Sequence, residues 1–246
     1  MKAVMVLAVV TMTCFGASGG NTPLGSGHWE GTFDLPDQKV DITVDLARNE
    51  RGEWTGSMNF PGERLEGIEL ADIKISGRSV FFASKEKISG VQAEISEDGV
   101  TMKGGFLVAF VRTVPVPLTM RRVSDAKVTA GPPSTPVGKD LAGTWSGEVK
   151  YGHATSETEL PASKMLSVRV TIDGSPGGAA RGTMTNPFDS AKPVALTTVA
   201  QQGAQVRFEA RSAMTVFTGV LRGNEIAGEW KQFGADAVPL TLKKMP

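Results

Sequence analysis

The chain has 246 residues, with 26 lysines and arginines balanced by 26 aspartates and glutamates, 40% hydrophobic residues and one cysteine. A net charge of zero excludes the broad electrostatic attraction on which nucleic-acid binding and binding to anionic membranes depend. One cysteine excludes an intramolecular disulfide and a thiolate metal cage, and two histidines, His28 and His153, leave little for a zinc or iron site. We therefore expect no metal and no cofactor.

Residues 1–19 have the pattern of a secretory signal peptide. Lys2 precedes an apolar run that is too short to span a membrane, and Ala17 and Gly19 have the spacing that signal peptidase prefers. This pattern predicts export to the periplasm or out of the cell, without a membrane span. Lipid attachment at Cys14 is an alternative, although Thr11-Met12-Thr13 lacks the Leu and small residues that normally precede a lipidated cysteine.

The rest of the chain repeats itself. Gly27-His28-Trp29-Glu30-Gly31 recurs as Gly143-Thr144-Trp145-Ser146-Gly147, and Val116-Pro117-Leu118-Thr119 recurs as Val238-Pro239-Leu240-Thr241. Matched anchors in the same order indicate two tandem units of ordinary domain size. We predict one repeat over 27–122, a Pro-rich linker over 123–142 and a second repeat over 143–244.

Apolar and polar residues alternate within each repeat. Residues 40–46 and 166–172 both place an apolar side chain at every second position, and glycine-containing turns such as 97–99 and 173–174 separate such runs. A period of two predicts strands with one apolar face, about seven or eight in each repeat. The fold class predicted is all-β, with two tandem antiparallel meander domains that resemble calycin barrels, because closure hides the edge strands.

Trp29 and Trp145 open the first strand of each repeat, and the basic pairs Arg121-Arg122 and Lys243-Lys244 end the last strand. In a closed barrel the first and last strands are neighbours, so each tryptophan would lie beside a basic side chain in a cation–π contact. We predict a structural role for these residues, with each indole plugging the bottom of its barrel.

The order of motifs resembles that of a known bacterial module. Gly-x-Trp-x-Gly, alternating strands, Gly-x-Met, Gly-x-x-Val-x-Phe and a terminal Val-Pro-Leu-Thr are similar to the small β domain that precedes the catalytic domain in some exported α/β-hydrolases and penicillin-binding-like serine hydrolases. The Gly-x-Trp start is also similar, less specifically, to lipocalins. The resemblance covers both repeats and implies a fold and an exported setting. It implies no activity, because the chemistry of those enzymes resides in the other domain.

No catalytic constellation emerges from the sequence. Gly16-Ala17-Ser18-Gly19-Gly20 matches the nucleophile motif Gly-x-Ser-x-Gly only as a string, because it lies in the predicted signal peptide. His28 has Thr144 at the same place in the second repeat, so no histidine site is common to both repeats. The acidic residues of the first hairpin lack the spacing of a calcium loop; they are Asp34, Asp37, Asp41 and Asp45.

The run Phe106–Val111 is apolar on both faces, and Phe81 beside Phe82 breaks the alternation in the same way. An outward apolar face needs a cover, which can be the other repeat, a second molecule, a hydrophobic ligand or a membrane lip. We predict an interaction surface formed by Phe81, Phe106, Val108 and Phe110.

Two functional hypotheses follow. The first is a non-enzymatic exported binding or accessory protein that holds a small apolar ligand inside a barrel. The second is a structural or protein-interaction module of the cell envelope that uses the strand at 106–111. The side chains expected to line a barrel interior, as ligand contacts or as core, are Val40, Ile42, Val44, Val80, Phe82, Val168, Val170, Val206, Phe208 and Phe217.

Overall fold

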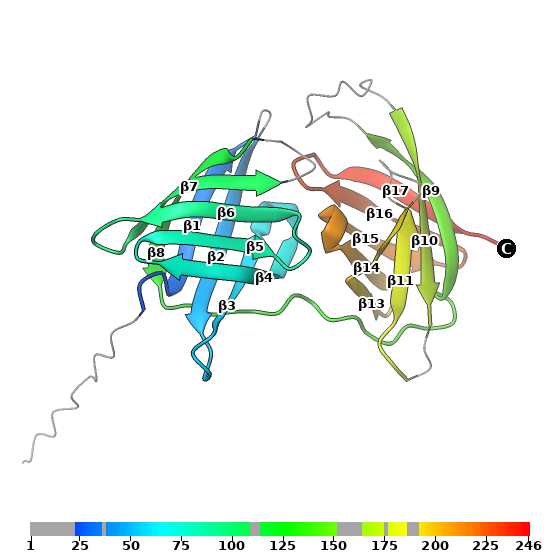
Figure 1. The fold of residues 1–246 in the computed structure, drawn as a ribbon. Coiled ribbons are helices and arrows are strands. Elements are labelled where there is room, and N and C mark those ends of the chain that lie inside the picture. Colours follow the sequence, from blue (N-terminus) through cyan, green and yellow to red (C-terminus); the bar gives the residue numbers. More distant parts are fainter. Residues whose placement is uncertain (1–22, 36–37, 109–113, 152–163, 175–176, 186–191) are drawn as a thin grey trace, which may run out of the picture.

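The computed structural model describes residues 23–35, 38–108, 114–151, 164–174, 177–185 and 192–246 (Figure 1). Strands dominate this part of the chain, and its helices are two short 3-10 turns, η1 (Pro61–Glu63) and η2 (Arg211–Ala213). No helix in the described ranges is long and apolar enough to cross a membrane. The predicted all-β class with two barrel-like units is confirmed.

The first repeat is a closed antiparallel barrel in which each strand pairs with the next and β8 returns to β1. Its strands are β1 (Gly27–Asp34), β2 (Lys39–Arg48), β3 (Trp54–Phe60), β4 (Leu65–Ser76), β5 (Ser79–Ser84), β6 (Ser89–Ile95), β7 (Thr101–Val108) and β8 (Val116–Ser124). The predicted alternation places one face of each strand inside. In β2, for example, Val40, Ile42, Val44 and Leu46 point into the barrel and are almost fully buried.

The second repeat is a nine-stranded half-barrel in the order β12-β11-β10-β9-β17-β16-β15-β14-β13. Its strands are β9 (Gly143–Tyr151), β10 (Lys164–Asp173), β11 (Arg181–Thr185), β12 (Pro193–Ala195), β13 (Thr198–Gln202), β14 (Gln205–Ala210), β15 (Thr215–Arg222), β16 (Glu225–Gln232) and β17 (Val238–Lys244).

The two edge strands of this half-barrel are consecutive in the chain. The two residues that connect β12 to β13 continue the hydrogen bonding on both sides. The amide of Leu196 donates to the carbonyl of Gly182 at 2.9 Å, and the amide of Thr197 donates to the carbonyl of Glu209 at 2.7 Å. Strands β12 and β13 together therefore take the place that the single strand β4 takes in the first barrel. Strand β4 is itself irregular, since its register with β5 shifts between Ala71 and Lys74.

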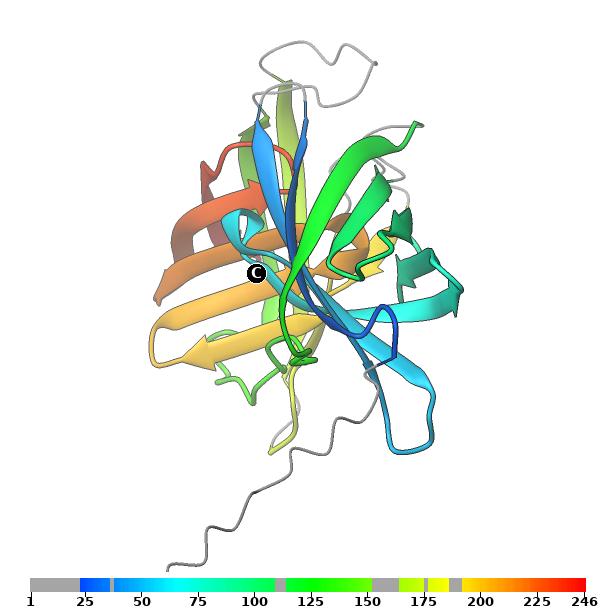
Figure 2. The same ribbon diagram turned by 90° about the vertical axis from the view of Figure 1, so that its left-hand side faces the viewer.

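The second repeat closes one end of the first barrel, and the first barrel lies in front of it in Figure 2. Phe233, in the loop between β16 and β17, is 1% exposed and belongs to the hydrophobic core of the first barrel, as do Met214 and Val216. Its ring lies 5.0 Å from that of Phe60 and 6.4 Å from that of Phe33, measured between centroids. The repeats thus share a core.

The segment between the repeats packs against both. In the first repeat, the amide of Lys127 donates to Oδ1 of Asp45 at 2.7 Å. In the second, the amide of Thr135 donates to the carbonyl of Val199 at 2.9 Å, and its carbonyl accepts from the amide of Ala180 at 3.0 Å. The predicted linker is therefore part of the packed structure rather than a spacer that stands clear of it.

Candidate binding site on the wall of the first barrel

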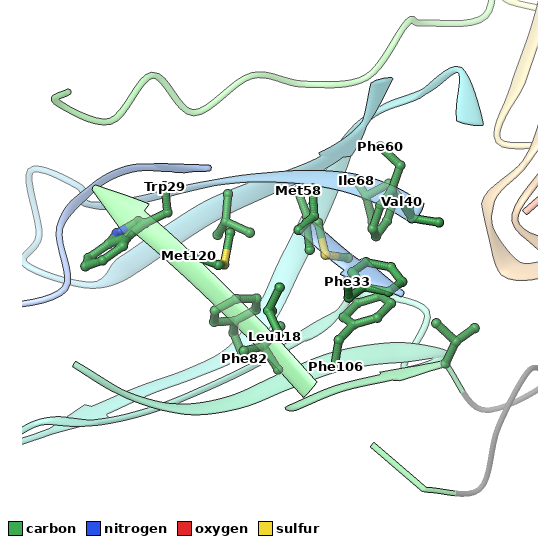
Figure 3. Packing of buried hydrophobic residues seen from close by; sticks show 14 of the residues in the cluster. Trp29, Phe33, Val40, Met58, Phe60, Ile68, Phe82, Phe106, Leu118 and Met120 are labelled. Carbon is green, nitrogen blue, oxygen red and sulfur yellow. The ribbon is translucent and has the colours of Figure 1, made fainter. Parts of the chain in front are cut away.

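The side chains predicted to line the barrel interiors all lie in the two hydrophobic cores. Val40, Ile42, Val44, Val80 and Phe82 pack in the first core, and Val168, Val170, Val206, Phe208 and Phe217 pack in the second. Figure 3 shows the first core, where Trp29 lies at one end and Phe33, Phe60 and Phe106 gather at the other. These side chains therefore act as packing.

A hollow of about 480 Å³ lies instead on the outer wall of the first barrel, over β4 to β7. This volume is within the range of small-ligand sites, which is about 300–1,000 Å³. The ring of Phe81, 38% exposed, lines the hollow together with Gln92, Gly104, Gly105 and Pro115. Strands β4 to β7 lie next to one another across the barrel in Figure 1.

The strand register explains how these residues meet. Lys74, Phe81, Gln92, Gly105 and Pro117 are successive cross-strand partners from β4 to β8. Cross-strand partners share a face of the sheet with Cβ atoms about 4.5–5.5 Å apart. Phe81 consequently stands between a long cationic side chain and an amide. Beyond the amide, Pro115 lies over Gly105, where a Cβ atom would come within 2.7 Å of the Cβ atom of Pro115.

A second row runs parallel to the first and is offset from it by two residues along each strand. It consists of Ser76, Ser79, Glu94, Lys103 and Thr119. Because it brings hydroxyl, carboxylate and ammonium groups, the hollow combines one apolar side with hydrogen-bonding groups of both kinds.

Two ammonium groups on the rim lack a partner. Within the described ranges, neither Lys74 nor Lys103 lies within 4.0 Å of a carboxylate. The other three lysines of this barrel, Lys39, Lys85 and Lys87, each lie that close to an aspartate or glutamate. Among the lining residues the two ammonium groups are accompanied by one carboxylate, that of Glu94, which is the cross-strand partner of Lys103 and lies 4.0 Å from Nη2 of Arg78.

The predicted interaction surface is wrong for two residues and stays a prediction for Phe81. Phe81 points outward as predicted, whereas Phe106 and Val108 are buried in the first core and cannot contact a partner. They share the inward face of β7 with Met102, so the outward apolar residue of this strand is Leu107, 38% exposed. Phe110 lies outside the described residues.

The opening tryptophans occupy equivalent buried positions. The indole N–H of Trp29 donates to the carbonyl of Gly25 at 3.0 Å, and that of Trp145 donates to the carbonyl of Leu141 at 2.8 Å. The ammonium of Lys244 lies 5.3 Å from the centroid of the Trp145 ring, which is the predicted type of cation–π contact.

The other basic residues of these strand ends lie opposite acidic ones. Arg121 is the cross-strand partner of Glu30, and Nζ of Lys243 lies 3.7 Å from Oε1 of Glu225. Arg122, rather than Arg121, is the partner of Trp29 in the register of β1 and β8.

His28 pairs with a buried carboxylate. Its Nδ1 lies 2.9 Å from Oδ1 of Asp45, an atom that also accepts from the amide of Lys127. The second repeat has Thr144 and Thr171 in the same cross-strand position, with their hydroxyl oxygens 3.3 Å apart. A neutral pair thus fills this place in one repeat and an ionisable pair in the other, as expected of a structural contact.

Other acidic residues give no sign of a metal site. In the ranges that the structure covers, no group of three or more His, Cys, Asp or Glu side chains converges as metal ligands would. The pKa values that depart from their ordinary range belong to exposed turns: a hydrogen bond from Ser96 lowers the pKa of Asp98, and a hydrogen bond to Glu69 raises that of Lys85.

Sequence reasoning missed Lys74, Gln92, Lys103 and Gly105. Each is an ordinary outward residue in its own strand, and only the register of four neighbouring strands brings them together. The available signal was Phe81, an aromatic residue at a position where alternation predicts a polar one.

Comparisons with known proteins leave the function open. No family model and no curated protein matches the chain. Among the solved structures that resemble it is a protein of unknown function from the DUF3598 family of Nostoc punctiforme. That protein is 14% identical, with a TM-score of 0.25, and the match covers 90% of this chain and 97% of the other. Another is a candidate outer membrane protein of Bacteroides fragilis, 12% identical, with a TM-score of 0.27 and a match over 89% of this chain and 97% of the other. Similarity this low carries no functional argument, so the resemblance to β domains of exported hydrolases stays a prediction.

Proposed function

We propose that this chain is a non-enzymatic, exported binding protein that takes its ligand on the outer wall of the first barrel. The observation that carries the proposal is the hollow beside Phe81, with the ammonium groups of Lys74 and Lys103 on its rim. An exposed aromatic ring next to a hollow, with a few polar groups around it, has the composition of a binding site. The exported setting rests on residues 1–19, and N-terminal sequencing of protein recovered from a bacterial periplasm tests it; we expect the mature chain to begin after Gly19.

The wall supports this function better than the barrel interior does. An apolar ligand inside the first barrel would have to displace a cluster of phenylalanine rings, since Phe33, Phe60 and Phe106 meet one another and Phe233. Opening that cluster exposes apolar surface of both repeats at once, at a cost of about 25 cal/mol for each Å². The wall presents its groups without any rearrangement.

Amide NMR of the mature chain with a library of small polar and aromatic fragments tests the proposal. We expect fragments to shift the amide signals of Phe81, Gln92 and Gly105 together. Replacing Ser79→Trp fills the hollow from β5 and should abolish these shifts. Thr32→Trp, at an exposed position of β1, is the matched control and should leave them unchanged.

Two results would overturn the proposal. Shifts confined to interior residues such as Val40 and Phe82 would move the ligand into the barrel and restore the first hypothesis. Fragments that bind the Ser79→Trp variant as well as the natural chain would show that the hollow is not the site.

A further inference from the structure

The wall of the second repeat already serves as a docking surface for the first. Arg207, Thr218 and Glu229 form a cross-strand row on β14, β15 and β16. Arg207 donates from Nη2 to the carbonyl of Arg64 at 2.7 Å. Arg64 in turn donates from Nη1 to Oγ1 of Thr218 at 3.4 Å and from Nη2 to Oε2 of Glu229 at 2.8 Å.

The adjacent row on the same wall extends this contact. Nζ of Lys231 lies 3.3 Å from Oε2 of Glu63, and both side chains are almost fully buried. Val216, its cross-strand neighbour, packs into the core of the first barrel. From η2, Nη2 of Arg211 donates to the carbonyl of Glu66 at 3.4 Å. The wall thus holds the turn at 61–66, partly through side-chain donors on main-chain carbonyls.

The first repeat has the same rows, and they hold no such turn in the described part of the chain. By register, Phe81, Gln92 and Gly105 take the places of Arg207, Thr218 and Glu229, and Gly90 and Leu107 take those of Val216 and Lys231. Phe81 and Leu107 accordingly remain 38% exposed. One repeat uses this wall to bind a polypeptide turn. On the equivalent wall of the other, Pro115 lies over Gly105, and no other segment in the described ranges covers Phe81 and Leu107 in the way that residues 61–66 cover the second wall.

The wall of the first repeat differs from the wall of the second in the chemistry of its side chains. An arginine and a glutamate at the centre of the second wall are replaced by Phe81 and Gly105, which removes both charges and leaves the hollow. At the rim, Ala200 and Ala227 of the second repeat are replaced by Lys74 and Lys103. Between the two lysines, Glu94 takes the place of Val220 and lies 4.0 Å from Nη2 of Arg78. The centre is thus apolar and the rim carries more ammonium than carboxylate groups, which favours a ligand with the complementary arrangement.

We infer that the wall of the first barrel docks a turn of a partner protein that carries an apolar side chain at its tip and an aspartate or glutamate on each side. The two lysines are three strands apart and lie in rows that are offset by two residues, which places them about 16 Å apart along the wall. The residues that flank a turn lie within about 7 Å of each other, so the long lysine and carboxylate side chains span the rest of that distance. The inference rests on the proposed function and names the class of its ligand.

Selection of a displayed library of cyclic seven-residue peptides on the full mature chain tests the inference, with counter-selection on the Phe81→Ser variant. We expect the recovered peptides to carry one aliphatic or aromatic residue between acidic residues. A synthetic copy should shift the amide signals of Phe81, Gln92 and Gly105. Combining Lys74→Gln with Lys103→Gln should weaken its binding about tenfold, since each exposed ion pair contributes up to about 1 kcal/mol.

Lys85→Gln is the matched control, because the ammonium of Lys85 lies 2.7 Å from Oε2 of Glu69 and is already paired; it should leave the affinity unchanged. Peptides that bind at the wall without acidic residues, or that bind the double lysine variant equally well, would refute the acidic turn while leaving the wall as a binding site. Fragments that bind at the wall where no peptide does would refute a protein partner. A wall that binds neither would overturn the proposed function as well.

Discussion

Replacing Phe233→Ala should destabilise the repeat to which this residue does not belong. The side chain is 1% exposed and its ring faces those of Phe33, Phe60 and Phe106 of the first barrel, with centroids 5.0 to 6.5 Å away. Truncation of a buried phenylalanine to alanine costs about 3–5 kcal/mol, because packing is lost and a cavity remains. For a protein of this size that corresponds to a fall in Tm of about 6–20 °C.

Thermal unfolding combined with hydrogen exchange measures both the size and the place of this effect. We expect the natural chain to unfold in one transition, since the repeats share a core. In the variant, amides of β1 to β8 should lose protection before those of β9 to β17. Phe208→Ala is the matched control: Phe208 stacks on Phe217 at 5.6 Å within the second core, so its loss should weaken the second repeat first. A fall in Tm below about 2 °C for Phe233→Ala, or unchanged protection in the first barrel, would refute the shared core.

Two further predictions concern polar contacts. The double variant His28→Thr and Asp45→Thr installs the pair that the second repeat uses, and we expect it to fold with a Tm within a few degrees of that of the natural chain. Asp45→Thr alone should have a lower Tm, because Nδ1 of His28 loses the carboxylate beside it, and thermal unfolding of both variants compares them. In the turn before β7, a hydrogen bond from Ser96 and a weaker effect of the Val100 amide lower the pKa of Asp98 below 3.8. The ionised carboxylate therefore contributes stability above pH 3.8, and this contribution is lost as the pH falls through the lowered pKa. Ser96→Ala should raise the pKa of Asp98 in an NMR titration, and an unchanged pKa would contradict the role of Ser96.

The sequence predicted the frame of both repeats because the frame depends on local patterns. Alternation in β2 and β10 and glycine at the turns are properties of short segments, and the opening tryptophans mark the same place in each repeat. The indole contacts of Trp29 and Trp145 show how closely the two frames agree, since each donates to the carbonyl four residues earlier.

The outward face of β7 was mispredicted because its run of apolar residues hides the alternation. Phe106 and Leu107 are both apolar, so the sequence does not reveal which of them faces inward, and the pairing with β6 and β8 decides it. The position of Phe233 was beyond local reasoning for another reason. Nothing in its own segment indicates that it fills the core of the other repeat, because that depends on how two barrels dock.

The two repeats agree inside and differ outside, and this contrast is the basis of the functional argument. Val80 and Phe82 in β5 have identical equivalents inside the second repeat, whereas Phe81 between them corresponds to Arg207. Packing constrains the inner positions in both copies alike, since each core must be filled. The residues at the outer positions depend on what each wall contacts. In the second repeat that contact is the first barrel, and the side chains are polar and charged to suit it. In the first repeat the same positions hold an aromatic ring and a glycine, and the proposed contact for them is a partner protein.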